Sequence, residues 1–158
     1  MQVSESPAGT VRGIIDTNRY MVLATADRTG LPWSSPVYFA HREYRELFWL
    51  SSPRATHSRN IEVRPQVGIA VFDSSVRIGT GQGVYMSAVA RAVAGPDVED
   101  TIEVFSRRSL WHGGMAWTAD DVGETAGLRL YRAVAHEHWI LAKDGDPDHR
   151  IPVHLTRT

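Results

Sequence analysis

The sequence predicts a mainly β protein with short helices, in which six largely antiparallel strands form a small barrel or an α+β sheet. Short apolar or alternating runs recur along the whole chain, as expected for strands buried on one or both faces. Turn residues separate the first three runs at short intervals, which is typical of an antiparallel meander. Segments with a helical pattern are few and short, so strands dominate the expected fold.

The elements are expected within a single domain over residues 1–158, because this length supports one core and is too short for two comfortable domains. Residues 1–10 are small and polar and predict a flexible N-terminal arm. Short helices are expected over 11–19, 54–63 and 97–110. The six strands are expected over 20–27, 31–42, 47–52, 66–74, 83–95 and 128–141.

The bulk composition excludes several classes of function. The formal net charge of −1 gives no global attraction to nucleic acid or to an anionic membrane, so neither partner is expected. The chain has no cysteine, which excludes disulfides and thiolate metal sites. It also has no long apolar run and no signal-peptide pattern at its start, and a cytoplasmic protein is therefore expected.

The segment "LFWLSSPRATHSRN" changes abruptly from an apolar strand to hydroxyl and cationic residues. Ser52 and Pro53 suit the N-cap and first position of the helix expected at 54–63, where free backbone N–H groups and the helix dipole favour an anion. Arg54, His57 and Ser58 share one face of that helix. This composition is typical of a phosphate site, although an ordinary solvated helix start would have the same residues.

The upstream segment "PWSSPVYF" has a proline on each side of Ser34 and Ser35. These prolines would interrupt a strand ladder and leave backbone groups free for a flat, hydrogen-bonding ligand. An edge strand, in which proline is also tolerated, is the alternative interpretation.

Three ordered segments, "LATADRTGLPWSSPVYF", "LFWLSSPRATHSRNIEVRPQVGIAVFD" and "GQGVYMSAVARAV", resemble the flavin-binding split-barrel superfamily related to pyridoxamine 5'-phosphate oxidase. That group includes branches that use FMN or the deazaflavin F420. The resemblance covers about residues 12–95. It implies a six-stranded antiparallel split β-barrel of the FMN-binding type and a homodimer with cofactor sites at the subunit interface.

The resemblance also implies roles for individual residues. One strand would line the isoalloxazine ring, the next would contact the ribityl chain and phosphate, and the helix start would hold the phosphate. Gln82 would reach the ring across the dimer interface, and His57 stands where many relatives have lysine or arginine. The implied cofactor-binding residues are Ser34, Ser35, Pro36, Val37, Trp49, Ser51, Ser52, His57, Ser58, Arg59 and Gln82.

The leading functional hypothesis is therefore a small FMN-dependent oxidoreductase that transfers hydride between flavin N5 and a small-molecule substrate. No catalytic residue is assigned. An F420-dependent reductase is a close alternative. A non-catalytic flavin- or haem-binding carrier or sensor is the third hypothesis, with His57, His112 and His136 as candidate haem ligands.

No metal site is expected, since the pattern of aspartates near residue 146 lacks the glycine and glutamate of a calcium loop. His136 and His138 are expected to share one strand face, where they would ligate a metal or make packing contacts. Trp111, Trp117 and Trp139 are expected to be core or interface aromatics, and any of them could cover a flavin face, with Trp139 the preferred candidate. Arg150 loosely resembles a substrate-phosphate arginine of the oxidase.

Overall fold

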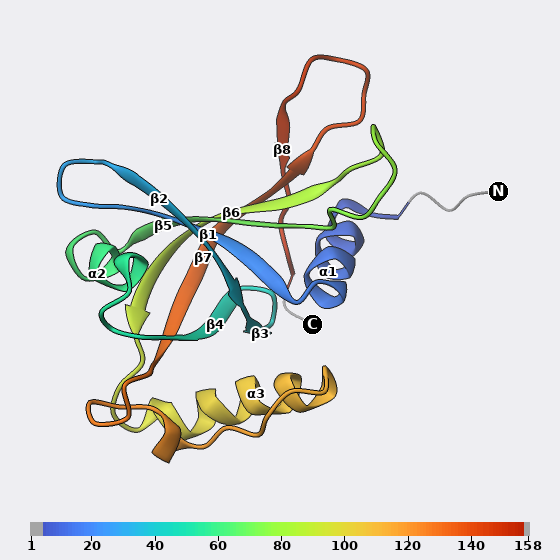
Figure 1. The fold of residues 1–158 in the computed structure, drawn as a ribbon. Coiled ribbons are helices and arrows are strands. Elements are labelled where there is room, and N and C mark those ends of the chain that lie inside the picture. The colour runs from blue at the N-terminus through green and yellow to red at the C-terminus, as the bar shows by residue number, and fades with distance from the viewer. Residues whose placement is uncertain (1–4, 157–158) are drawn as a thin grey trace.

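A computed structural model describes residues 5–156 and shows eight strands in one antiparallel sheet, three α-helices and one 3₁₀ turn (Figure 1). In chain order the elements are α1 (Pro7–Thr17), β1 (Tyr20–Ala26), β2 (Pro32–Tyr38), β3 (Ala40–Arg42), β4 (Glu46–Ser51), α2 (Thr56–Val63), β5 (Gln66–Phe72), β6 (Gly83–Ala92), α3 (Asp97–Trp111), η1 (Ala119–Asp121), β7 (Arg129–Leu141) and β8 (Arg150–Pro152). No helix within this range is long and apolar enough to cross a membrane. The prediction of a mainly β, antiparallel fold with short helices is confirmed.

The sheet has the strand order β2-β1-β5-β6-β7-β4-β3, with β8 paired to β7. Two of its strands were not predicted separately. The segment expected as one strand over 31–42 breaks at Phe39, whose N–H donates to the Arg19 carbonyl while its side chain is fully buried. As a result β2 pairs with β1, whereas β3 pairs with β4. The short strand β8 lies beyond the last predicted strand.

The sheet curls so that β2 approaches β4, although no strand ladder joins these two within residues 5–156. The barrel is therefore split between β2 and β4. Helix α2 follows β4 directly and covers this end of the barrel, and it packs against both β1 and β2. The split consequently brings together the proline-flanked serines of β2 and the polar segment that follows β4.

Two apolar clusters hold the fold. The larger one fills the barrel, and within it the Trp49 and Tyr131 rings stack with their centroids 5.6 Å apart. The smaller one joins α3 to the outer side of the sheet through Ala40, Phe48, Ile102, Phe105 and Leu130. Figure 1 shows α3 lying across the end of the sheet, beyond β3 and β4.

The two helix starts differ from the predictions. Helix α1 begins at Pro7 with Ser6 as its N-cap, so the prediction of a flexible arm was wrong for residues 7–10, while residues 1–4 lie outside the described part. Helix α2 begins at Thr56, because Ser52 to Ala55 form a hydrogen-bonded turn instead of the first helical turn. Ser52 accepts a bond from the Arg54 N–H and is not the N-cap, which is Ala55.

Candidate functional site

A cleft of about 670 Å³ lies at the split, between β2 and β4 on one side and α3 with the segment after it on the other. Its floor contains Val37, Leu50 and Phe105, and Met115 and Trp117 form part of the opposite wall. Its polar lining includes the side chains of Ser51, His57 and His112, with Arg19 and Tyr20 contributed by the start of β1. The cleft is thus mostly apolar with a few polar groups, as is usual for a small-molecule site.

The imidazole of His57 spans the split between the two strands. Its Nε2 lies 2.7 Å from Ser51 Oγ on β4, and its Nδ1 lies 3.1 Å from Ser35 Oγ on β2. Burial lowers the pKa of His57 below its ordinary value, which favours the neutral ring. A neutral imidazole donates to one hydroxyl and accepts from the other, so both ring nitrogens are engaged.

The first turn of α2 borders this polar bridge. Its N-cap, Ala55, supplies no side-chain hydrogen bond to the turn. Ser58 is 4% exposed, and its Oγ has no hydrogen-bond partner among the described residues. Because side chains in a helix tilt toward its N-terminus, the Ser58 hydroxyl lies at the start of α2, where no side chain caps the backbone N–H groups. Arg54 and Arg59 are both exposed beside it.

A second histidine enters the cleft from the C-cap of α3. His112 Nδ1 lies 2.8 Å from Tyr38 Oη, and no hydrogen bond engages His112 Nε2 within residues 5–156. Burial, followed by the charges of Arg108 and Arg19, lowers the pKa of His112. Burial also raises the pKa of Tyr38, so the phenol is un-ionised at neutral pH. The site therefore presents one unengaged imidazole nitrogen of a neutral ring.

The segment 112–118, called the strap below, runs back along α3 and forms a wall of the cleft. Two buried serines of α3 hold its backbone: Ser106 Oγ accepts from the Trp117 N–H at 2.8 Å, and Ser109 Oγ donates to the Met115 carbonyl at 2.7 Å. The Gly114 N–H also donates to the Ser109 carbonyl. These bonds fix the position of the Trp117 indole, whose ring packs edge-on against Phe105.

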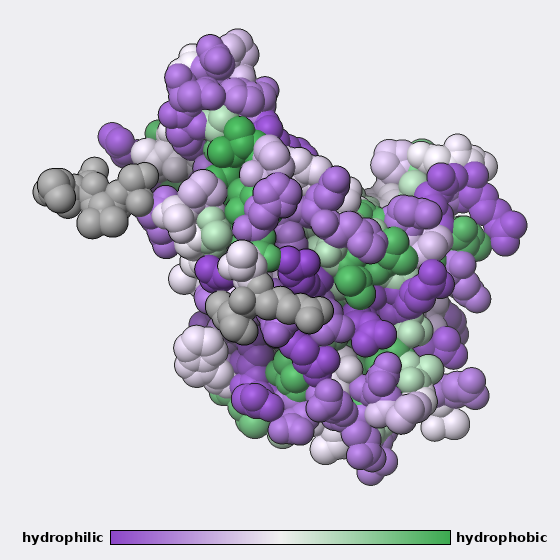
Figure 2. Space-filling view, turned by 180° about the vertical axis from the view of Figure 1, so that it is seen from behind, coloured by the Kyte–Doolittle hydropathy of each residue, from purple (hydrophilic) through white to green (hydrophobic). Residues whose placement is uncertain are grey.

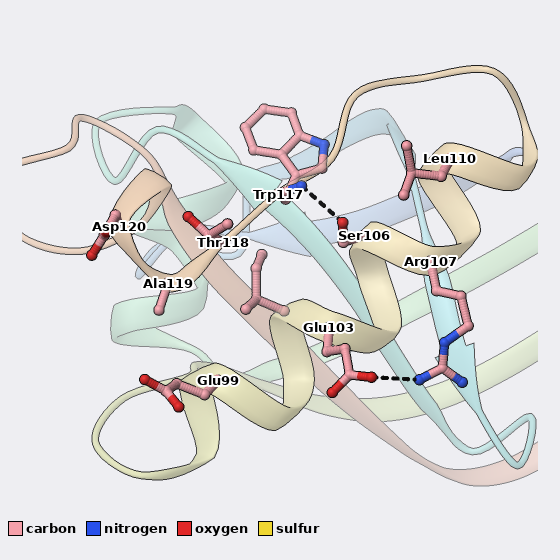
Figure 3. A pocket seen from close by; sticks show the side chains of 10 residues that line it. Glu99, Glu103, Ser106, Arg107, Leu110, Trp117, Thr118, Ala119 and Asp120 are labelled. Atoms are coloured by element: carbon pink, nitrogen blue, oxygen red, sulfur yellow. Dashed lines mark hydrogen bonds and ion pairs between the residues drawn. The ribbon is translucent and has the colours of Figure 1, made fainter.

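Trp117 also lines a second concavity, the outer groove, of about 540 Å³ between α3 and η1. Figure 3 shows Glu99, Glu103 and Arg107 on the helix, with Asp120 and the Trp117 indole above them. Glu103 pairs with Arg107 at 3.1 Å. The Trp117 indole thus separates an acidic outer groove from the mostly apolar cleft.

The structure brings only part of the predicted set to the cleft. Pro36, Val37, Ser51 and His57 line it, and Ser35 reaches it through His57. Ser34 is exposed on β2 without lining the cleft, whereas Ser52, Ser58 and Arg59 lie around the start of α2. Trp49 and Gln82 lie elsewhere.

These last two residues have structural roles that their sequence context did not reveal. The Trp49 side chain points into the barrel core and is 0% exposed. The side-chain amide of Gln82 is used within its own chain: Nε2 donates to the Leu141 carbonyl at 3.0 Å and Oε1 accepts from the Leu141 N–H at 2.8 Å. The buried position of Trp49 does not agree with a side-chain contact to the ribityl chain or phosphate, whereas the contact of Gln82 with a flavin across a dimer interface stays a prediction.

Sequence reasoning missed most of the α3 wall. Tyr38, Ser106 and Ser109 were not assigned to the site, His112 was named only as a candidate haem ligand, and Trp117 only as one of three tryptophans that could cover a flavin face. The available signal was the Gly113-Gly114 pair immediately after an amphipathic helix, because such a pair lets the chain reverse and run back along the helix.

The predicted face shared by His136 and His138 is wrong. A bulge opposite Ser87 and Ala88 inserts His136 as an extra residue into β7. His136 is consequently exposed, whereas His138 is buried with its Nε2 2.8 Å from the Tyr44 carbonyl. Within residues 5–156 no group of three or more histidine or carboxylate side chains is placed to hold a metal ion. Trp139 lies near β8, and Arg150 lies over the Tyr85 ring, both outside the cleft.

The curled antiparallel sheet, open between β2 and β4 and with a ligand-sized cleft at the opening, defines the class of split β-barrels. Residues 8–135 match the family described as pyridoxamine 5'-phosphate oxidase, and the chain belongs to that family. The resemblance drawn from the sequence motifs is thereby confirmed.

Three solved structures show how widely this fold is shared. The heme storage protein HutZ from Vibrio cholerae is 24% identical over 85% of this chain and 92% of its own, with a TM-score of 0.66. A heme binding protein from Mycobacterium smegmatis is 19% identical over 95% of this chain and 59% of its own, with a TM-score of 0.67. ChuZ from Campylobacter jejuni is 14% identical over 96% of this chain and 61% of its own, with a TM-score of 0.72. The chain thus spans about three fifths of the latter two proteins. At these identities the likeness concerns the fold, and no curated protein sequence matches the chain.

Proposed function

We propose that this protein binds haem in the cleft and acts as a non-catalytic haem-binding carrier or sensor, with His112 as the iron ligand. The observation that carries the proposal is the unengaged Nε2 of His112 at the cleft, on a ring whose Nδ1 faces Tyr38 Oη at 2.8 Å. Histidines that ligate metals have this arrangement, in which the second ring nitrogen is held by a fixed partner. The similarity to structures of heme storage and heme binding proteins supports the same choice.

The cleft fits a large planar ring with acidic substituents. Its volume of about 670 Å³ lies in the usual range for cofactor sites, and aromatic or apolar side chains from both walls would cover the ring faces. Arg19 lies at the β1 side of the lining and forms no ion pair within residues 5–156. Its guanidinium would pair with a haem propionate. The bound iron would supply redox and gas-ligand chemistry.

The residues of the chain set which histidine binds the iron. Tyr38 Oη accepts from Nδ1–H of His112 in the tautomer that leaves Nε2 as a lone-pair donor. Burial favours the neutral form of this ring, which is the form that ligates a metal. His57 is a poorer ligand because both of its nitrogens are engaged by serine hydroxyls.

Titration of the purified protein with haemin, followed by its Soret absorbance, tests the proposal. We expect saturable one-to-one binding, and His112→Ala should weaken it about 100-fold and shift the Soret band. Tyr38→Phe should weaken it about tenfold, as loss of a partner of the ligand does elsewhere. His136→Ala, which removes an exposed histidine outside the cleft, is the matched control and should bind as the unmodified protein does. Equal binding by the His112→Ala and His136→Ala variants would exclude His112 as the ligand.

A second candidate is the FMN-dependent oxidoreductase, and the unpartnered Ser58 hydroxyl at the uncapped start of α2 specifically favours it. Backbone N–H groups and a free hydroxyl at a helix start suit the phosphate of FMN or of F420. Arg54 and Arg59 would add charge-assisted bonds. Comparing FMN with riboflavin, which lacks the phosphate, isolates these contacts. If this site operates, FMN should bind at least tenfold more tightly, and Ser58→Ala with Arg59→Ala should remove the difference.

We also propose that two copies of the chain associate around the cleft. Exposed apolar side chains gather near its mouth: Trp111 is 75% exposed, Met115 67% and Tyr20 60%. Figure 2 shows apolar side chains reaching the surface among polar ones. Burying such side chains between copies would stabilise a homodimer. Light scattering coupled to size exclusion should give twice the monomer mass, and a monomeric result at high concentration would contradict the proposal.

A further inference from the structure

We propose that Ser51, His57 and Ser35 form a catalytic group that hydrolyses small carboxylic esters in the cleft. Ser51 would be the nucleophile, His57 the general base and Ser35 the residue that orients the imidazole. This activity goes beyond cofactor binding and does not depend on it.

The geometry is that of an activated serine. Ser51 Oγ lies 2.7 Å from His57 Nε2, within the range for proton transfer between a nucleophile and its base. The opposite ring nitrogen, Nδ1, lies 3.1 Å from Ser35 Oγ. When Nδ1–H donates to Ser35, Nε2 carries the lone pair that accepts the Ser51 proton. A nucleophile, a base and an orienting group in this order define such sites on unrelated folds.

The two serines are not equivalent with respect to the cleft. Ser51 and His57 both line it, whereas Ser35 does not. An ester in the cleft would therefore meet the Ser51 hydroxyl, and Ser35 stays behind the imidazole as its partner. The pKa of His57 is lowered by burial, so the ring is a free base at neutral pH. A serine partner stabilises the imidazolium less than a carboxylate does, so a slow hydrolase is expected.

The start of α2 would stabilise the negative charge of the tetrahedral intermediate. His57 is itself in the first turn of α2, so the positive end of the helix lies beside the base. The N-cap Ala55 has no side-chain oxygen to occupy the first N–H groups of the helix. Oxyanions are stabilised by donors of this kind.

Hydrolysis of the ester consumes only water besides the ester itself. Ser51 Oγ bonds to the acyl carbon as its proton passes to His57 Nε2, and the ester C–O bond then breaks as that proton moves to the leaving alcohol. Water next gives a proton to His57 and its oxygen bonds to the acyl carbon. The Ser51 ester breaks, the acid leaves, and the proton returns to Ser51.

Two measurements on the full chain free of cofactor test the proposal. A fluorophosphonate probe should add one adduct per chain, which peptide mapping by mass spectrometry should place on Ser51. Hydrolysis of p-nitrophenyl acetate should exceed the buffer rate and should be lost in Ser51→Ala. His57→Gln keeps a hydrogen-bonding group between the serines but has no base, and it should slow both reactions about 100-fold. Ser87→Ala removes an exposed serine on β6 and should leave both rates unchanged.

The adduct is read on the unmodified chain, so it does not depend on the stability of a variant. An absence of any adduct on Ser51, or labelling of equal rate in the His57→Gln variant, would overturn the proposal. The labelling rate should also increase with pH as His57 loses its proton, and then reach a plateau. The midpoint of this increase should lie below pH 6.5, the usual imidazole pKa. A rate that keeps rising with hydroxide concentration would indicate chemistry without His57. Haem binding is read separately by its Soret band, so failure of one proposal leaves the other to its own test.

Discussion

The cleft and the outer groove share the Trp117 indole but differ in what faces it. In the cleft the polar groups are the Arg19 guanidinium, hydroxyls and imidazoles, and hydrogen bonds join Tyr38 to His112 and join His57 to Ser35 and Ser51 across the split. In the outer groove the polar groups are the carboxylates of Glu99, Glu103 and Asp120 with one arginine, on the solvent side of α3 (Figure 3).

This difference shows where ligand binding and stability are concentrated. A half-buried hydrogen bond costs free energy when one partner is removed, because the remaining group is left without water or protein to bind. A carboxylate at the surface keeps its hydration and contributes little. We therefore expect changes in the cleft to alter stability strongly and changes in the groove to alter it little.

The largest effect is expected for His57→Ala. The substitution leaves the Ser35 and Ser51 hydroxyls, both buried, without their shared partner. Each stranded group costs about 1–3 kcal/mol, so the free energy of unfolding should fall by about 3 kcal/mol. Urea denaturation measures the change. A loss below 0.5 kcal/mol, roughly the size of a surface substitution, would show that the imidazole does not hold the split together.

A somewhat smaller effect is expected for Trp117→Ala, which removes the wall between the two concavities. Trp117 is half-buried and packs on Phe105, so the stability loss should be about 2 kcal/mol, less than for a fully buried tryptophan. Trp111→Ala is the matched control at a dilution where the chain is monomeric, because that side chain is 75% exposed in the single chain. If both variants lose the same stability, Trp117 is not a structural wall.

Gly114→Ala tests how the strap is held against α3. A Cβ at this position would lie 2.6 Å from Ser109 Oγ, the hydroxyl that bonds the Met115 carbonyl. The strap should shift outward at a cost of about 1–2 kcal/mol and weaken ligand binding in the cleft. Gly81→Ala meets no atom within 4 Å and serves as the control in thermal denaturation. Equal melting temperatures for the two variants would contradict a tightly packed strap.

The pH dependence of stability sharpens the same comparison. Burial lowers the pKa of His41, His57, His112 and His138 in the folded protein. Below the unfolded imidazole value of about 6.5 the unfolded chain binds protons that the folded chain does not, so stability should be full above this pH. It should fall as the pH drops below 6.5, until the folded histidines also become protonated. Denaturation midpoints from pH 7.5 to 5 measure this, and His57→Gln should reduce the slope. A midpoint independent of pH would mean that these rings are not buried.

The smallest effect is expected for Glu99→Gln combined with Asp120→Asn in the outer groove. Both carboxylates are exposed and form no ion pair or hydrogen bond among the described residues. Stability should change by less than about 0.5 kcal/mol. Haemin affinity in the cleft should also stay unchanged. A loss of affinity on this far side of Trp117 would show that the two concavities are coupled.

Local signals in the sequence predicted much of the fold. Local residue patterns predicted the apolar strand β5, the turn at Asp27–Gly30 and the amphipathic helix α3. The start of α2 was placed too early because Ser52 and Pro53 fit two competing structures equally well, a helix N-terminus and a turn. The break at Phe39 was missed because an apolar residue continues the strand pattern while its backbone leaves the ladder.

The site was predicted only on the side that one continuous stretch of chain provides. Ser51 and His57 lie six residues apart, and both reached the cleft as expected. Trp49 was misplaced because alternation along a strand shows that two faces exist but not which of them is the core. The α3 wall approaches β2 from 74 residues away, as in the contact between Tyr38 and His112, and no local pattern reports such a contact.

By itself, the sequence determined the strands, the helices, the family and the polar character of the segment after β4. These follow from periodicity, turn chemistry and motif order, which depend on near neighbours. Only the tertiary structure decided that β2 and β4 stay unpaired, that one imidazole bridges them and that α3 closes the other side. Those features depend on how far the sheet curls before its edges meet, which is set by the packing of the whole core.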